Sequence, residues 1–187
     1  MLKRRLYDEE HEMFREAVRR FLMAEAVPFH DAWEEAGITP REFWLKAGAQ
    51  GLLCPQVPES YGGPGGDYRY LAIVQEEMML LGITGPNFAV HSDICGEYVL
   101  KYGTEAQKKQ WVPKFVSGEA ICAIAMTEPN AGSDLQAIRT TAVRDGDEYV
   151  INGSKIFISN GQNADVIILA AKPDPAERAR GMSLILV

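Results

Sequence analysis

Hydrophobic residues recur with helical spacing through the first part of the chain. The first predicted helix has Asp8 as a suitable N-cap, acidic residues in the turn that follows, and an end before Pro28. Its apolar residues fall on one helical face, at positions i, i+3, i+4, i+7 and i+8: Phe14, Ala17, Val18, Phe21 and Leu22. This pattern predicts an amphipathic helix with one buried face.

The same spacing predicts four further helices before residue 119. They run from Thr39-Pro40 to Gly48 or Gly51, from Asp67 to Leu81, from Thr84 to Tyr102 with entry at Pro86, and from Thr104 to Ser117. The last one begins with a capping box, because Gln107 stands three residues after Thr104. Three prolines and four glycines between residues 52 and 66 predict a loop there. We expect Glu76 and Glu77 on the solvated face of their helix.

The hydrophobic period changes from about 3.6 to about 2 near residues 118–120. The predicted strands are Cys122–Met126, Arg139–Val143, Tyr149–Lys155, Ile156–Gly161, Asp165–Ala171 and Met182–Val187. Residues 144–147 form a predicted hairpin turn with a glycine where a positive φ is needed, and Lys172–Arg180 is a predicted charged loop. We therefore expect an α+β protein, with an all-helical domain over residues 1–119 and an antiparallel β-barrel or sandwich domain over residues 120–187.

The β domain is expected to be incomplete. Residues 182–187 form an apolar strand at the end of the sequence. Such a strand leaves an unpaired sheet edge, which natural proteins avoid. We therefore interpret the sequence as part of a longer chain.

The composition excludes several classes of function. A formal net charge of −7 argues against a nucleic-acid surface. The three cysteines, Cys54, Cys95 and Cys122, are far apart, which indicates free thiols in a reducing compartment and neither a disulfide framework nor a zinc site. No apolar segment follows the basic N-terminal residues, and none is long enough to span a membrane. The expected location is the cytoplasm.

A polar turn directly after the strand Cys122–Met126 is the first candidate site. Its sequence, TEPNAGSD, is rich in residues that favour irregular backbone. A loop of this kind at a strand end can present several amide donors to one anionic or polar ligand. A second candidate segment, Ile156–Gly161, carries Phe157 and Ser159 on one face of a predicted strand.

These segments resemble the acyl-CoA dehydrogenase family. AMTEPNAGSDLQA is similar to the family signature, and INGSKIFISNG is similar to its second flavin-contacting segment. In the helical part of the chain, three further segments also resemble the family and stand in the expected order: EEHEMFREAVRRFL, GLLCPQVPESYGGPGGDY and GPNFAVHSDICGEYVLKYGTEAQKKQW. The long-chain enzymes are the most similar type. The resemblance covers essentially the whole chain, and it implies that the family's C-terminal helical bundle is absent from this sequence.

The resemblance implies FAD as the cofactor. Thr127, with the backbone of Met126, would donate to the pyrimidine edge of the flavin, where negative charge develops when the ring is reduced. Phe157 would lie against the isoalloxazine, and Ser159 would bond toward its reactive nitrogen. The full set of implied cofactor-binding residues is Ile124, Met126, Thr127, Ser133, Phe157, Ile158 and Ser159.

The implied substrate contacts are Ser133, Phe88 and His91. Phe88 and His91 share a helix face with Ile94, and in the family this helix lines the acyl-chain tunnel. Core packing is the favoured interpretation for both side chains. Asn130 stands where many members of the family have glycine, and the departure is mild because asparagine also accepts left-handed backbone.

No residue of this chain is assigned as the catalytic base. Glu128 and Asp134 could be taken for an acid–base pair, but the turn gives each a local backbone role, and the family's base is a glutamate of the C-terminal bundle. The implied reaction is α,β-dehydrogenation of a fatty acyl-CoA to a trans-2-enoyl-CoA in fatty acid β-oxidation, with electrons passing to an electron-transfer flavoprotein. We expect the parent to be a homotetramer, and the chain by itself to bind FAD weakly or not at all and to be inactive.

Two other functions remain open. The parent could be a related flavoprotein with oxidase or monooxygenase chemistry, which an assay for peroxide would distinguish. It could also be a non-enzymatic interaction or CoA-binding module, which a reading frame that continues past Val187 would exclude.

Overall fold

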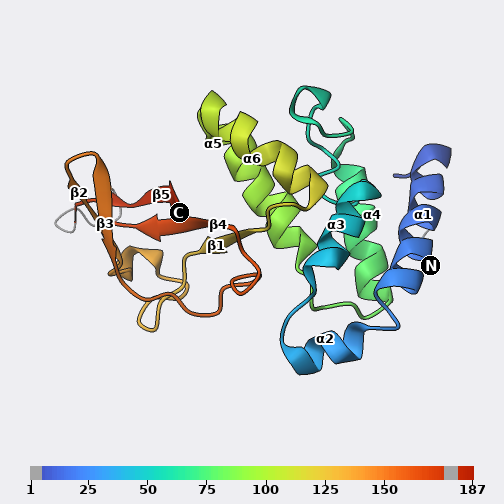
Figure 1. Ribbon diagram of the computed structural model, residues 1–187, viewed down its shortest axis with the longest axis horizontal. Helices are drawn as coiled ribbons and strands as arrows, with labels where there is room; N and C mark the ends of the chain where they lie inside the picture. The colour runs from blue at the N-terminus through green and yellow to red at the C-terminus, as the bar shows by residue number, and fades with distance from the viewer. Residues whose placement is uncertain (1–5, 175–180) are drawn as a thin grey trace. The chain divides into compact units, whose positions relative to one another are not determined.

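Residues 6–174 and 181–187 are described by the computed structural model in Figure 1. The chain divides into two compact units, Met1–Ile121 and Cys122–Val187. The first unit is helical and the second is built of short β-strands, so the predicted α+β class is confirmed. The predicted domain boundary lies between residues 119 and 120.

The helical unit contains the five helices predicted from the apolar spacing and two further elements, α2 (His30–Ala36) and η1 (Glu59–Tyr61). In chain order they are α1 Glu9–Glu25, α2 His30–Ala36, α3 Arg41–Ala49, the 3-10 turn η1 Glu59–Tyr61, α4 Tyr68–Leu80, the π-helix η2 Ala89–Gly96, α5 Glu97–Tyr102 and α6 Glu105–Ser117. Three predicted helix starts are confirmed, because Asp8 caps α1, Asp67 caps α4, and Thr104 with Gln107 forms the capping box of α6. No helix within residues 6–174 and 181–187 is long and apolar enough to cross a membrane.

The helical unit differs from the prediction in two places. Helix α2 was not predicted, because its seven residues are too few to show a helical repeat. The predicted helix from Thr84 begins later, since η2 starts at Ala89. The side chain of Asn87 accepts a hydrogen bond from the amide of Val90 (3.0 Å), so Asn87 caps the first turn.

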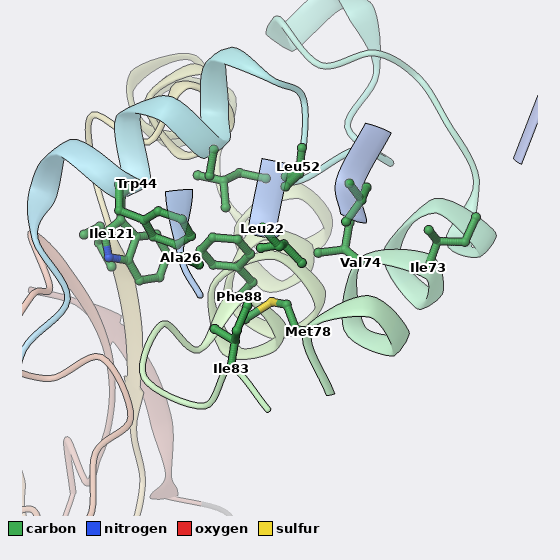
Figure 2. Packing of buried hydrophobic residues seen from close by; sticks show 14 residues of the cluster. Leu22, Ala26, Trp44, Leu52, Ile73, Val74, Met78, Ile83, Phe88 and Ile121 are labelled. Atoms are coloured by element: carbon green, nitrogen blue, oxygen red, sulfur yellow. The ribbon is translucent and has the colours of Figure 1, made fainter. Parts of the chain in front are cut away.

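The core of the helical unit joins α1, α3, α4 and the residue that opens η2. Figure 2 shows Phe88 among the side chains of Leu22, Trp44 and Met78. The rings of Phe88 and Trp44 meet edge to face, with centroids 5.0 Å apart. Aromatic pairs of this geometry stabilise a core beyond the area that they bury.

Glu77 of α4 is fully buried, so its expected place on a solvated helix face is wrong. Its Oε2 accepts from Arg19 Nε (2.7 Å) and its Oε1 accepts from Arg15 Nη1 (3.0 Å), and both arginines belong to α1. Glu76 is half-buried and lies 2.8 Å from Arg15 Nη1. A buried charge is tolerated when it is paired and hydrogen-bonded, and here the partners lie on another helix.

The β unit holds a three-stranded sheet and a separate hairpin. The sheet has the strand order β1-β4-β5, with β1 Cys122–Ala125, β4 Val166–Ala171 and β5 Ser183–Leu186. The hairpin pairs β2 Thr141–Asp145 with β3 Glu148–Asn152, and the 3-10 turn η3 Leu135–Ala137 precedes it. The pair β1·β4 is parallel, whereas an antiparallel domain was predicted. A single sequence shows where strands lie but not which strands pair when long segments separate them.

The predicted strand Ile156–Gly161 is wrong. Phe157 and Asn160 have left-handed backbone, with φ of 56° and 62°. A left-handed residue breaks the alternation of a strand, so Phe157 and Ser159 do not share a strand face. Residues 175–180 of the predicted charged loop lie outside the described residues.

Candidate functional site

Two irregular segments of the β unit lie side by side. One is the turn that follows β1, residues 126–134, and the other is the segment after β3, residues 153–161. The amide of Ile156 donates to the carbonyl oxygen of Thr127 at 3.0 Å. This bond joins the two segments that the sequence singles out as candidate sites.

Glu128 is the buried centre of the first segment. Its Oε2 accepts from the amide of Arg139 (2.6 Å), and its Oε1 accepts from the amide (2.9 Å) and the hydroxyl (2.6 Å) of Thr140. Only 4% of the residue is exposed. Glu128 thus binds backbone amides, as predicted, but these lie 11 and 12 residues away and not within the turn. A carboxylate so fully engaged is a poor general base.

Lys155 brings a positive charge to the same carboxylate. Its Nζ donates to Glu128 Oε1 (2.9 Å) and also to the carbonyl oxygen of Met126 (2.9 Å). Burial tends to raise the pKa of Glu128, but hydrogen bonds from Thr140, Arg139 and Lys155 outweigh it and lower that pKa to about 2. The pair is therefore a buried ion pair at neutral pH.

Other polar groups of the turn bond within it or to the residues that follow it directly. The amides of Glu128 and Ala131 exchange hydrogen bonds with each other's carbonyl oxygens (2.9 and 3.1 Å), and Asn130 Nδ2 donates to the carbonyl of Ala137 (3.0 Å). Asp134 Oδ1 accepts from the amide of Gln136 (3.1 Å), which confirms a local role for this carboxylate. A chain segment with these internal bonds holds one shape, so groups that it leaves unpaired are fixed in direction.

Phe157 is displayed from the second segment. Its side chain is 89% exposed although it is a large aromatic, and its backbone is left-handed. The next residue, Ile158, packs against the buried cluster of Ala125, Ala142, Leu169 and Ala171. An exposed aromatic residue in left-handed backbone is a genuine outlier, and such outliers gather at binding sites.

Thr127 lies half-buried where the two segments meet. Its peptide N–H has no hydrogen-bond acceptor among the residues that the structure describes. Met126 is half-buried and packs against Ala131, Ile138 and Ala170, while Ile124 is half-buried on β1, in register with Ile168. Three residues predicted from the sequence, Met126, Thr127 and Phe157, therefore lie at or next to the bond that joins the two segments, from Ile156 to Thr127.

Ser133 and Ser159 are exposed in the first and the second segment respectively. Neither hydroxyl contacts another predicted site residue within the described part of the chain. Both remain predictions from the family resemblance.

Phe88 and His91 belong to the core of the helical unit. They are 1% and 0% exposed, and His91 Nε2 lies 3.0 Å from the carbonyl oxygen of Phe115. Burial lowers the pKa of His91 to about 4, so the ring is neutral at physiological pH. Their burial agrees with the favoured core interpretation, and their substrate role stays a prediction from the family resemblance.

Lys155 is the site residue that the sequence did not reveal. The available signal was one lysine between the glycine of residue 153 and the apolar residues 156–158. Gly153 is needed there because a Cβ at this position would lie 2.2 Å from the hydroxyl of Thr140.

Among the described residues, no group of three or more histidine, cysteine, aspartate or glutamate side chains is placed to hold a metal ion.

Two family models match the chain. "Acyl-CoA dehydrogenase, N-terminal domain" matches residues 8–119, and "Acyl-CoA dehydrogenase, middle domain" matches residues 123–187. The mitochondrial long-chain specific acyl-CoA dehydrogenase of Sus scrofa is 50% identical over 186 residues, which cover 98% of this chain and 43% of that protein.

Solved structures agree with these matches. An acyl-CoA dehydrogenase from Geobacillus kaustophilus has a TM-score of 0.95 at 51% identity, over 99% of this chain and 49% of that one. A glutaryl-CoA dehydrogenase from Mycobacterium smegmatis in complex with FADH2 has a TM-score of 0.86 at 29% identity, over 98% and 46% of the two chains. The present chain thus spans less than half the length of these relatives.

Proposed function

Because the chain belongs to the acyl-CoA dehydrogenase family, we propose that the whole protein is an FAD-dependent dehydrogenase of fatty acyl-CoA thioesters. Its reaction is α,β-dehydrogenation to the trans-2-enoyl-CoA. The family membership supports the reaction class. The two adjoining segments of the β unit, residues 126–134 and 153–161, support a flavin as the group that the chain binds.

The proposal depends on two groups that lie on adjoining segments: a peptide N–H without an acceptor among the described residues, and an exposed aromatic ring. The Thr127 peptide N–H has no acceptor among the described residues, and Phe157 presents an 89% exposed aromatic face from the adjoining segment. A flat heterocycle with acceptor atoms along one edge satisfies both needs, because it stacks on an aromatic ring and accepts from an amide. The isoalloxazine of FAD is such a heterocycle, and the residues present fit it.

Each proposed contact follows from that fit. The Thr127 amide donates to the pyrimidine edge, Phe157 covers one face of the ring, and Ser159 bonds toward its reactive nitrogen. Ile124, Met126, Ile158 and Ser133 complete the proposed set, and Ser133 also serves the acyl-CoA. When bound, FAD accepts the hydride from the β-carbon of the substrate. The residues of this chain bind and orient it, and a carboxylate outside these 187 residues takes the α-proton.

Two partners belong to the same proposal. An electron-transfer flavoprotein reoxidises the reduced flavin, and the whole protein is a homotetramer. The isolated chain binds FAD weakly and is inactive, because it spans less than half the length of its relatives and contains no side chain assigned as the base.

The test is an anaerobic titration of the whole protein, purified with its flavin, against a fatty acyl-CoA. We expect bleaching of the visible flavin band and formation of one enoyl-CoA per flavin by mass spectrometry. The 187-residue chain under the same conditions is the control and stays colourless.

Three outcomes would contradict parts of the proposal. Whole protein without flavin would refute the cofactor. Peroxide formed in air at the rate of substrate consumption would replace dehydrogenase by oxidase chemistry. Enoyl-CoA formation by the isolated chain, with a dye as acceptor, would show that the base lies within these residues.

A further inference from the structure

Lys155 binds the peptide group that joins Met126 to Thr127, whose N–H is the donor without an acceptor among the described residues. Its Nζ lies 2.9 Å from the carbonyl oxygen of Met126, and the N–H of that same peptide belongs to Thr127. The described residues contain no cis peptide bond. In a trans peptide the carbonyl and the N–H point in opposite directions. A lysine that fixes the Met126 oxygen on one side therefore fixes the Thr127 N–H on the other.

The lysine itself is fixed by its second contact. Only 9% of its side chain is exposed, and its Nζ also donates to Glu128 Oε1 at 2.9 Å. Glu128 is in turn held by the amides of Arg139 and Thr140. A long flexible side chain thus has one geometry, because the ion pair at its tip is anchored in the backbone of the residues before β2.

A second bond holds the next peptide. The carbonyl oxygen of Thr127 accepts from the amide of Ile156, the residue that follows Lys155. Successive carbonyl groups of the turn are therefore held by successive residues of the other segment. The Thr127 N–H between them is the group that stays without an acceptor among the described residues.

We infer that Lys155 is a positioning residue of the proposed flavin site, which aims the Thr127 peptide N–H at the cofactor by binding the Met126 carbonyl. This inference rests on the proposed function, and it adds a role that ion pairing alone does not include. The amide is set in its direction before the ligand arrives, so binding does not have to order it.

Two substitutions separate positioning from ion pairing. Lys155→Met removes both the ion pair and the bond to the Met126 carbonyl. Glu128→Gln removes the charge of the pair but keeps a side-chain oxygen in the place of Oε1, so Lys155 Nζ can keep both of its contacts, to this side chain and to the Met126 carbonyl. Lys155→Arg restores a cationic donor, and Lys172→Met is the matched control, because Lys172 Nζ also donates to a backbone carbonyl of this unit, that of Gln136 (2.9 Å).

The first readout needs no flavin. In the isotope-labelled chain, the carbonyl carbon shift of Met126 and the amide shift of Thr127 report the bond directly. We expect both to move in Lys155→Met and to stay near the wild-type values in Lys155→Arg, Glu128→Gln and Lys172→Met. Equal shifts in Lys155→Met and Glu128→Gln would overturn the inference, since the ion pair alone would then set the peptide.

The second readout is flavin affinity in the whole protein. We expect Lys155→Met to raise the dissociation constant of FAD about tenfold, the effect of one misdirected hydrogen bond, with Lys155→Arg and Glu128→Gln within about twofold of wild type. Unchanged affinity in Lys155→Met would overturn the inference. If the wild-type protein holds no flavin, the proposed function fails, while the carbonyl shifts still decide whether Lys155 sets the peptide. Should Lys155→Met not fold, Lys155→Gln takes its place with a shorter side chain.

Discussion

Among the residues that the structure describes, each of the two units buries one glutamate, and the two glutamates are held in different ways. Glu77 of the helical unit is bound by the guanidinium groups of Arg15 and Arg19, which come from another helix. Glu128 of the β unit is bound by two backbone amides and a hydroxyl in addition to Lys155. The first arrangement joins two helices through charge, and the second fixes the path of a loop.

This difference predicts which part of the molecule loses stability when either glutamate is removed. A charge that joins two helices contributes to the stability of the whole unit. A carboxylate that satisfies loop amides stabilises the path of that loop, because those amides would otherwise be buried without partners. We therefore expect loss of Glu77 to weaken the contact between two helices, and loss of the Glu128 charge to weaken the β unit through the backbone of residues 139 and 140.

The largest effect is expected for Glu77→Ala. It leaves Arg15, whose side chain is 14% exposed, without its buried partner, and we expect a loss of about 3–5 kcal/mol in the free energy of unfolding. Urea unfolding followed by tryptophan fluorescence measures it. Glu76→Ala is the matched control one residue away, with a half-buried side chain and an expected loss of about 1 kcal/mol or less. Equal losses in the two variants would show that burial of Glu77 has no special weight.

Acid should weaken the β-unit pair through a defined pH range. The folded pKa of Glu128 is lowered to about 2 from an ordinary value of 4.5, so its contribution is complete above pH 4.5 and is lost as the pH falls toward 2. The contribution is of the order of 3 kcal/mol. The measurement is the difference in unfolding free energy between wild type and Glu128→Gln at several pH values. We expect this difference to shrink across the stated range, and a constant difference would contradict the assignment.

The helix starts could be predicted because their signals are local. Asp8, Asp67 and the pair Thr104 and Gln107 lie within three residues of the amides that they bind, and all of these caps form. Glu77 could not be predicted, because an acidic residue on a helix gives no sign of arginines on a second helix. Solvation is the ordinary fate of such a residue.

In the candidate site too, the features with a local sequence signal could be predicted and those set by distant residues could not. Its first segment, residues 126–134, could be found from turn residues after an apolar strand, since that signal is local. The left-handed backbone of Phe157, with φ of 56°, could not, because the residues on either side of it contact distant parts of the chain: Ile156 bonds to Thr127, and Ile158 packs against a cluster that includes Leu169. Lys155 was missed for the same reason: its partners, Met126 and Glu128, lie 29 and 27 residues away.

A smaller loss is expected for Gly153→Ala. The added Cβ would lie 2.2 Å from the hydroxyl of Thr140, which donates to Glu128, and 2.7 Å from the Thr140 Cα, so the backbone at one of the two positions must move. We expect a loss of about 1–3 kcal/mol in unfolding free energy. Gly132→Ala, in the same unit, places its Cβ where nothing lies within 4 Å, and should change stability by less than about 0.5 kcal/mol. A harmless Gly153→Ala would mean that residues 153 and 140 are not held as close together as the structure shows.

The smallest effect on stability, and an opposite one on binding, is expected at Phe157. The residue is 89% exposed, so its removal loses little buried area, while its left-handed backbone is unfavourable for any residue with a Cβ. Phe157→Gly should therefore raise the unfolding free energy by up to about 1 kcal/mol, and Phe157→Ala, which keeps the Cβ, should leave it near the wild-type value. Both variants should weaken FAD binding in the whole protein, because both remove the ring. A Phe157→Gly protein less stable than Phe157→Ala would show that the left-handed backbone is not kept. Wild-type affinity for FAD in both would show that the exposed ring serves something other than the flavin.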